Sequence, residues 1–192
     1  MSNVGTSSAS ALFQLSLHQD YCVQFEGANG NETVPCRMSN TTPCPVTDIV
    51  PDLIRSPVWT SYFDSNTAAV EYFYNDYETG SSMAASFDSQ VASDSQAAGG
   101  DDYVSLTSLA ARQAFGALEF TNTPETPYVF LKEISSDGNI QTVDVIFPFH
   151  PIAIYLNATI LRYMLDPLFI NQEAGYWPYQ FSIHDLGKPA ND

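Results

Sequence analysis

The chain has 192 residues, with 6 Lys or Arg against 22 Asp or Glu, so its formal net charge is −16. This excess of negative charge repels phosphate backbones and anionic membrane surfaces, which argues against nucleic-acid and membrane partners. The hydrophobic fraction of 44% fits a globular protein, and the longest apolar runs fall far short of the ~20 residues of a membrane span.

The first part of the chain combines two short β-type segments with a polar stretch. Apolar and polar residues alternate over residues 13–18 and 22–25, which predicts strands or extended segments. Residues 27–57 are rich in Gly, Asn, Thr and Pro, which predicts an irregular loop. We therefore divide the chain into an N-terminal part, residues 1–57, and a helical part, residues 58–192.

All three cysteines lie in the N-terminal part, at Cys22, Cys36 and Cys44. At most one internal disulfide can form among them, and a bond between Cys36 and Cys44 would close a short loop. Their spacing lacks the full ligand set of a structural zinc site, and no nearby histidine supplies the missing ligand. We expect neither a metal site nor a cofactor.

Three helices are predicted in the middle of the chain. Apolar residues recur at spacings of three and four over residues 61–77. A second helix, residues 83–97, carries Phe87 and Val91 on one face and ends at a glycine pair, because glycine readily adopts positive φ. A third helix, residues 103–118, has Asp101 or Asp102 as its N-cap.

A β-hairpin and a fourth helix are predicted after residue 127. Residues 121–127 contain two prolines and break the helical pattern. Residues 128–134 and 140–147 then predict a hairpin around the turn 135–139. Residues 156–172 predict a helix with Asn157 as its N-cap and a kink or break at Pro167. The fold class is therefore mainly α with a β-hairpin, preceded by short strands.

The pair His184-Asp185 is the first candidate for chemistry. An imidazole beside a carboxylate can hold one tautomer or share a proton near neutral pH. Neighbouring residues of an extended segment point to opposite sides, however, so the two side chains need not touch. In the alternative interpretation, Asp185 caps a following helix and His184 bonds to the backbone.

Asp144 is the third candidate catalytic residue, placed in the second predicted hairpin strand between Val143 and Val145. A solvated position on an edge strand is the alternative. On the facing strand, Lys132 and its neighbour Glu133 could pair with Asp144 or Gln141, or Lys132 could bind substrate.

Three further side chains are candidates for substrate binding. Arg112 could recognise a substrate α-carboxylate, for which the planar guanidinium is suited, or anchor a carboxylate of a neighbouring helix. Trp177 and Tyr179 could form an aromatic wall beside His184, or belong to the core. The sequence contains no nucleophile elbow, Walker loop, His-Glu-x-x-His helix or dinucleotide fingerprint.

Several strings of this sequence resemble the central region of the fungal glutaminase A family. They are FLKEISSDGNIQTVDVIFP (130–148), YLNATILRYMLDPLF (155–169) and FSIHDLG (181–187). The likeness continues upstream in SLTSLAARQAFG (105–116) and FYNDY (73–77), and more weakly in VQFEG (23–27). Enzymes of this family are secreted and hydrolyse glutamine to glutamate and ammonia.

The resemblance implies a partial (α/α) helical-hairpin toroid, preceded by a remnant of a β-sandwich. It also implies a fragment that is inactive alone, with the remaining parts of the toroid as its partners. An extracellular location is implied too, although the chain starts with no signal peptide of its own. Asn31, Asn40 and Asn157 begin Asn-x-Thr triplets and are candidate glycosylation sites, although such triplets also arise by chance.

Two other functions stay open. Helical toroids commonly cleave glycosidic bonds with paired carboxylates, and Asp144, Asp185 and Glu173 would then be the acids. The small-molecule substrate would be glutamine in the first interpretation and a sugar in this one. The third interpretation is a non-catalytic remnant that packs against partner chains.

Overall fold

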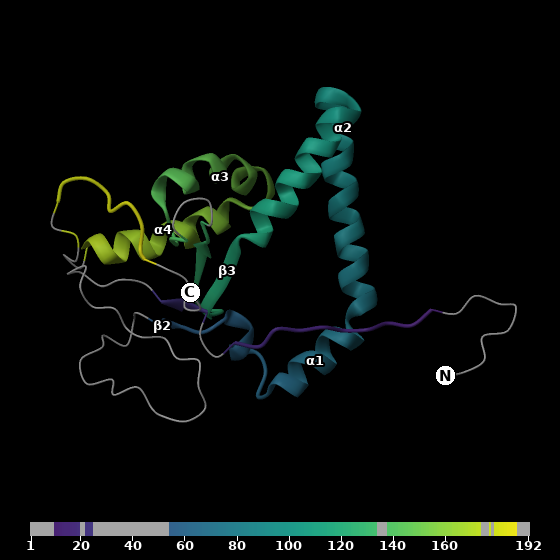
Figure 1. Ribbon diagram of the computed structural model, residues 1–192. Helices are drawn as coiled ribbons and strands as arrows, with labels where there is room; N and C mark the ends of the chain where they lie inside the picture. The colour runs from purple at the N-terminus through teal and green to yellow at the C-terminus, as the bar shows by residue number, and fades with distance from the viewer. Residues whose placement is uncertain are drawn as a thin grey trace, which may run out of the picture.

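The computed structural model describes residues 10–19, 22–24, 54–133, 138–173, 177 and 179–187. Over these ranges the fold is mainly helical with a two-stranded antiparallel hairpin, so the predicted fold class is confirmed. Figure 1 shows α2 as a tall bent helix on one side of the molecule, with α3 and α4 on the other and β3 between them. The helical elements are η1 (Val58–Ser61), α1 (Asn66–Asn75), α2 (Tyr77–Gly116), α3 (Val143–Leu156) and α4 (Ala158–Glu173).

The N-terminal part forms less sheet than predicted. β1 (Val23–Gln24) pairs antiparallel with β2 (Ile54–Arg55), which confirms part of the strand predicted at 22–25. Residues 13–18, predicted as a strand or an extended segment, form no strand, and their Leu15 is 99% exposed. Most of the predicted loop 27–57 lies outside the described residues, as do Cys36 and Cys44. The boundary at residue 57 stays a prediction.

The helix predicted over 61–77 is confirmed in shorter form as α1. It begins at Asn66 because Ser65 is its N-cap, and the Ser65 hydroxyl accepts a hydrogen bond from the amide of Ala68 at 3.1 Å. The preceding residues form η1, a short 3₁₀ turn, instead of the first turn of an α-helix.

The next two predicted helices are the two arms of α2, which bends sharply at Gly100 (Figure 1). Gly100 has φ 77° and ψ −166°, a conformation open essentially to glycine alone. It is therefore Gly100, and not an Asp101 or Asp102 cap, that separates the arms. The arms pack through the rings of Phe87 and Phe115, 6.2 Å apart, and through a 2.7 Å bond between the hydroxyls of Ser95 and Thr107.

The β-hairpin exists, but its strands differ from the predicted pair. β3 (Leu118–Thr123) pairs antiparallel with β4 (Thr126–Leu131), with Leu118 opposite Leu131. Pro124 therefore lies in the tight turn of the hairpin, where proline is well tolerated. The predicted second strand, 140–147, is wrong because α3 begins at Val143. One bridge, between Lys132 and Ile140, is the remnant of the predicted pairing.

The core lies where β4, α3 and α4 meet, and β1 packs onto it. Its fully buried side chains include Val23, Val129, Phe130, Ile140, Met164 and Leu186. The helix predicted at 156–172 is confirmed as α4, which is not split at Pro167. As predicted, Asn157 caps it, since its Oδ1 accepts the amide of Thr159 at 3.0 Å. None of the helices in the described part is long and apolar enough to cross a membrane.

Candidate functional site

A central segment, residues 139–142, connects the hairpin to the C-terminal loop. On one side the amide of Gln141 donates to the carbonyl of Leu131, at the end of β4, at 2.9 Å. On the other side Ile140 exchanges backbone hydrogen bonds with the loop, to the Gly187 carbonyl at 2.7 Å and from the Leu186 amide at 3.0 Å. The C-terminal loop is therefore held at a fixed register beside β4.

The buried side chain of Gln141 locks this segment in place. Its Oε1 accepts the amide of Leu131 at 2.8 Å, and its Nε2 donates to the carbonyl of Val129 at 2.8 Å and to that of Met164 on α4. Gln141 adopts φ 59°, in the left-handed region that non-glycine residues rarely occupy. One side chain thus bonds both β4 and α4, which accounts for a backbone conformation that costs free energy.

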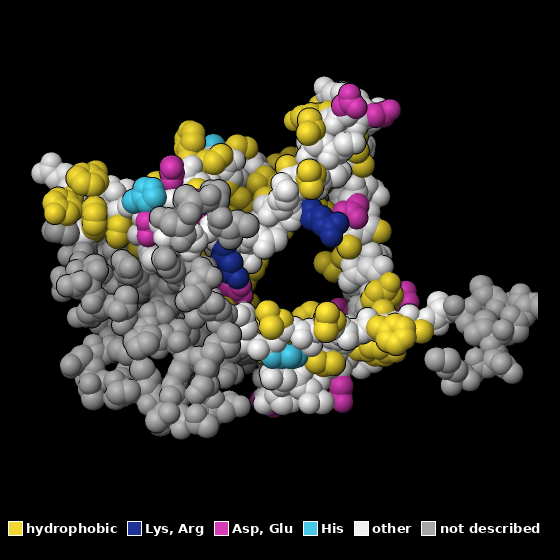
Figure 2. Space-filling model, viewed as in Figure 1, with side chains coloured by type: hydrophobic (Ala, Val, Ile, Leu, Met, Phe, Trp, Pro, Cys, Tyr) yellow, Lys and Arg dark blue, Asp and Glu magenta, His cyan; other side chains and the backbone are white. Residues whose placement is uncertain are grey.

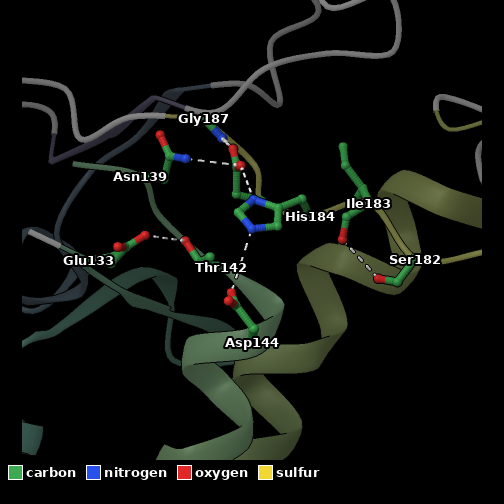
Figure 3. Close-up of polar contacts among 9 residues, drawn as sticks. Glu133, Asn139, Thr142, Asp144, Ser182, Ile183, His184 and Gly187 are labelled. Carbon is green, nitrogen blue, oxygen red and sulfur yellow. Dashed lines mark hydrogen bonds and ion pairs between the residues drawn. The ribbon is translucent and has the colours of Figure 1, made fainter. Parts of the chain in front are cut away.

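This arrangement places His184 against the first turn of α3. The carbonyl of His184 accepts the amide of Val143, the first residue of the helix, at 2.8 Å. The imidazole points toward Asp144 (Figure 3), with Nε2 at 3.6 Å from Asp144 Oδ1. Its Nδ1 lies 2.8 Å from Oδ2 of Asp185. The three predicted catalytic residues therefore meet, including the adjacent pair that extended geometry would have kept apart.

The carboxylate of Asp185 is held from three directions. Besides its contact with His184, it accepts a hydrogen bond from the Asn139 side-chain amide at 3.0 Å and another from the backbone amide of Gly187 at 2.9 Å (Figure 3). Asp185 therefore bonds within its own loop and to the central segment. In the alternative interpretation it was expected to cap a following helix, but no helix follows it in the described residues. It is 22% exposed, whereas His184 is 67% and Asp144 76% exposed.

The hydrogen bonds of His184 set the chemistry of the site. An ionised carboxylate accepts hydrogen bonds and donates none, so the neutral ring keeps its proton on Nδ1, facing Asp185. Nε2 then presents a lone pair on the side of Asp144, at a separation too long for a direct hydrogen bond. When the ring is protonated, both carboxylates attract it. This geometry suits a group that takes up a proton at Nε2 and gives it back.

A hollow of about 650 Å³ adjoins this histidine. Its apolar walls come from α3 and from the C-terminal loop, and its polar end holds Asp144, Ser182 and His184. Trp177, Tyr179 and Phe181 form an aromatic cluster with ring separations of 5.0–5.8 Å. Trp177 and Phe181 line the hollow but Tyr179 does not, so only one ring of the predicted pair Trp177 and Tyr179 lies there.

The remaining substrate-binding candidates lie elsewhere. Lys132 forms an ion pair with Glu119 on β3 at 2.5 Å, instead of the predicted pair with Asp144 or Gln141. Glu133, next to it, accepts a bond from the Thr142 hydroxyl at 3.2 Å. Arg112 projects from the second arm of α2 into a different hollow. Neither Lys132 nor Arg112 lines the hollow at His184.

Asp144 lies in a helix and not in the predicted strand. Its exposure agrees with the solvated alternative, but it belongs to the first turn of α3, where the helix dipole favours a carboxylate. Sequence reasoning also missed Asn139, Gly187 and Phe181. The aromatic residues at every second position from Trp177 to Phe181 could have indicated Phe181; no sequence pattern indicates the bonds of Asn139 and Gly187.

The carboxylate Glu173 and the candidate glycosylation site Asn157 lie away from the hollow at His184. Glu173 is an exposed residue at the end of α4 and does not line the hollow at His184. Asn157 is exposed at the start of α4, and Asn31 and Asn40 lie outside the described residues. Over the described ranges, no group of His, Cys, Asp and Glu side chains has an arrangement that could hold a metal ion.

Comparison with known proteins shows which family this chain resembles. Residues 100–191 match the family model described as the glutaminase A six helical-hairpin domain. The chain is 41% identical, over 94% of its length, to a protein named glutaminase A from Aspergillus oryzae. The chain belongs to the glutaminase A family. No solved structure matched it.

A second relative within the family is a probable glutaminase of Arthroderma benhamiae, 42% identical over 70% of this chain. The chain spans 23% of the length of the Aspergillus glutaminase A and 16% of that of the Arthroderma protein. The matched domain contains α3, α4, the His184 loop and the second arm of α2. Nothing in these relatives' names supports the sugar substrate considered above.

Proposed function

We propose that this chain forms part of the active site of a glutaminase, which hydrolyses L-glutamine to L-glutamate and ammonia. The observation that carries the proposal is the contact of His184 with Asp144 and Asp185 beside an open hollow. Membership of the glutaminase A family supports the reaction class.

In this proposal His184 moves the proton. Nε2 takes a proton from a water molecule as the water oxygen attacks the side-chain amide carbon of glutamine. The C–N bond then breaks, and His184 returns the proton to the departing nitrogen, which leaves as ammonia. Asp185 holds the ring by its Nδ1–H and stabilises the protonated ring, as the buried aspartate of a hydrolase triad does. Asp144, on the Nε2 side, orients the water or the substrate ammonium.

We also propose that the chain is inactive alone and needs the further length that its relatives have. Large apolar side chains are exposed on its helices, among them Met83, Leu106, Leu109, Phe169 and Ile170. Large apolar side chains that face water on several helices are typical of surfaces that another part of a protein covers. Further helical hairpins would cover these faces, and would supply donors for the oxyanion that forms during amide hydrolysis.

The third proposal is that the protein acts outside the cell and carries a glycan on Asn157. Asn157 begins an Asn-x-Thr triplet, is exposed, and uses Oδ1 for its cap, so its Nδ2 is available for the sugar. Expression in a secreting yeast, with mass measurement before and after glycosidase treatment, tests this. Thr159→Ala should remove the glycan while Asn157 still caps α4.

A chimera tests the proposed reaction. The segment of the Aspergillus glutaminase A that aligns with this chain would be replaced by the residues of this chain, and ammonia release from glutamine would be measured. We expect activity from the chimera, none from the 192-residue chain, and a loss of roughly 10²-fold or more in kcat on His184→Gln. Arg162→Gln, an exposed change on α4, is the control. Unchanged kcat in folded His184→Gln would remove His184 from the mechanism.

A further inference from the structure

The α2 hairpin carries a second hollow, which is separate from the one at His184. Its volume is about 730 Å³, and the two hollows have no lining residue in common. The side chains that matter in it are Asp88, Arg112, Ser108, Phe87, Phe115 and Val91. They come from both arms of α2, whose packing at Phe87 and Phe115 fixes the shape of the hollow.

Two opposite charges face this hollow from opposite arms. Asp88 lies on the first arm and Arg112 on the second, and both are exposed. Figure 2 shows basic and acidic side chains together on the inner flanks of the α2 arms. The Asp88 carboxylate and the Arg112 guanidinium form no ion pair, so their oxygen and nitrogen atoms are more than 4.0 Å apart. In the described part of the chain, neither group forms an ion pair with any other side chain.

Among the basic side chains that the structure describes, Arg112 differs from the other two in having no carboxylate partner. Acidic residues outnumber basic ones 22 to 6, so partners are abundant. Lys132 is paired with Glu119, and Arg162 is paired with Asp166 one turn away. Arg112 instead lines the open hollow, together with the packed rings of Phe87 and Phe115. Its five donors are arranged to bind a carboxylate through two parallel hydrogen bonds.

We propose that this hollow binds a free α-amino acid by its zwitterionic head group. Arg112 binds the α-carboxylate and Asp88 binds the α-ammonium, while Phe87, Phe115 and Val91 contact the side-chain methylenes. A separated pair of opposite charges matches the separated charges of a zwitterion, and a lone anion or cation would match only one of them. The site is a second one and does not rest on the proposed reaction at His184.

Isothermal titration of the 192-residue chain with L-glutamine tests this site, with chemical-shift mapping to locate it. We expect a millimolar dissociation constant, because both charges are exposed. The affinity for glutamine should fall about fivefold or more in Arg112→Gln and in Asp88→Asn. Asp102→Asn on the same helix and Arg162→Gln on α4 are the matched controls. His184→Gln should bind as tightly as the unchanged chain, which separates this site from the proposed active site.

Two analogues of glutamine make the assignment of each charge testable. N-acetylglutamine lacks the ammonium and glutaminamide lacks the carboxylate, so both should bind more weakly to the unchanged chain. Asp88→Asn should no longer distinguish glutamine from N-acetylglutamine, and Arg112→Gln should no longer distinguish glutamine from glutaminamide. No binding of glutamine, equal affinities in all variants, or shifts confined to the His184 hollow would overturn the proposal.

Discussion

The α2 hairpin and the central segment 139–142 are stabilised in opposite ways. Each arm of α2 follows from its own residues, and a glycine separates the arms. The central segment instead depends on partners 10 to 46 residues away, through the side chains of Gln141 and Asn139. The candidate active site is built on the second region. Its geometry is therefore a product of tertiary contacts, and local changes far from His184 can disturb it.

The largest expected effect comes from removing the Gln141 side chain. Gln141→Ala leaves the Leu131 amide and the Val129 carbonyl without their side-chain partner in the core, and also removes the bond that ties β4 to the Met164 carbonyl of α4. We expect a loss of ~3 kcal/mol in the free energy of unfolding, because each buried unsatisfied group costs ~1–3 kcal/mol. Urea unfolding measures it. If Gln141→Ala loses no more than Gln113→Ala, an exposed change on α2, the central segment does not depend on this side chain.

A smaller effect is expected at the bend of α2. Gly100→Ala places a Cβ at φ 77°, and although there is space for it, the conformation costs ~1–3 kcal/mol. Gly116→Ala, also with open space around it but at ordinary helical geometry, should be neutral or slightly stabilising. Thermal unfolding of both variants compares them. Equal melting temperatures would mean that the bend is not set by Gly100.

The core beneath β4 should show a specific pH dependence. Burial raises the pKa of the Cys22 thiol, and the nearby Glu119 carboxylate raises it further. The folded chain thus keeps this proton above pH ~8.5, where the unfolded chain loses it. The stability that Cys22 contributes is therefore complete below that pH and decreases above it, by at most ~1.4 kcal/mol per pH unit. Between pH 7.5 and 9.5, the free energy of unfolding of Cys22→Ala should fall by ~1 kcal/mol less than that of the unchanged chain. Urea unfolding at the two pH values measures this difference. An equal fall in both proteins would contradict the prediction.

The smallest expected effect is at the start of α4. Asn157→Ala removes the side-chain acceptor for the Thr159 amide and should cost ~1 kcal/mol, as loss of an N-cap typically does. Asn157→Asp keeps the acceptor and should retain the stability. Both can be measured by urea unfolding of unglycosylated protein. The α4 cap would be irrelevant if the alanine and aspartate variants unfolded alike.

The same contrast explains which parts of the structure the sequence could predict. The arms of α2, α4 and the Asn157 cap follow from periodicity and capping residues, which act locally. Residues 140–147 alternate like a strand, but tertiary contacts decide otherwise. The Gln141 side chain bonds to β4 and α4, and the amide of Val143, the first residue of α3, donates to the carbonyl of His184. Residue types alone identified His184, Asp185 and Asp144. Their contact, and the support from Asn139, required the folded chain.

The state of the His184 ring is the most direct test of the account. Nitrogen-15 NMR of the 192-residue chain, at a pH where the ring is neutral, reports which ring nitrogen carries the proton, and His184→Gln identifies the resonance among the three histidines. We predict the proton on Nδ1, held by Asp185, with Nε2 as the unprotonated nitrogen on the side of Asp144, and a loss of this preference in Asp185→Ala. A proton on Nε2 in the unchanged chain would contradict the proposed role of His184 as the base.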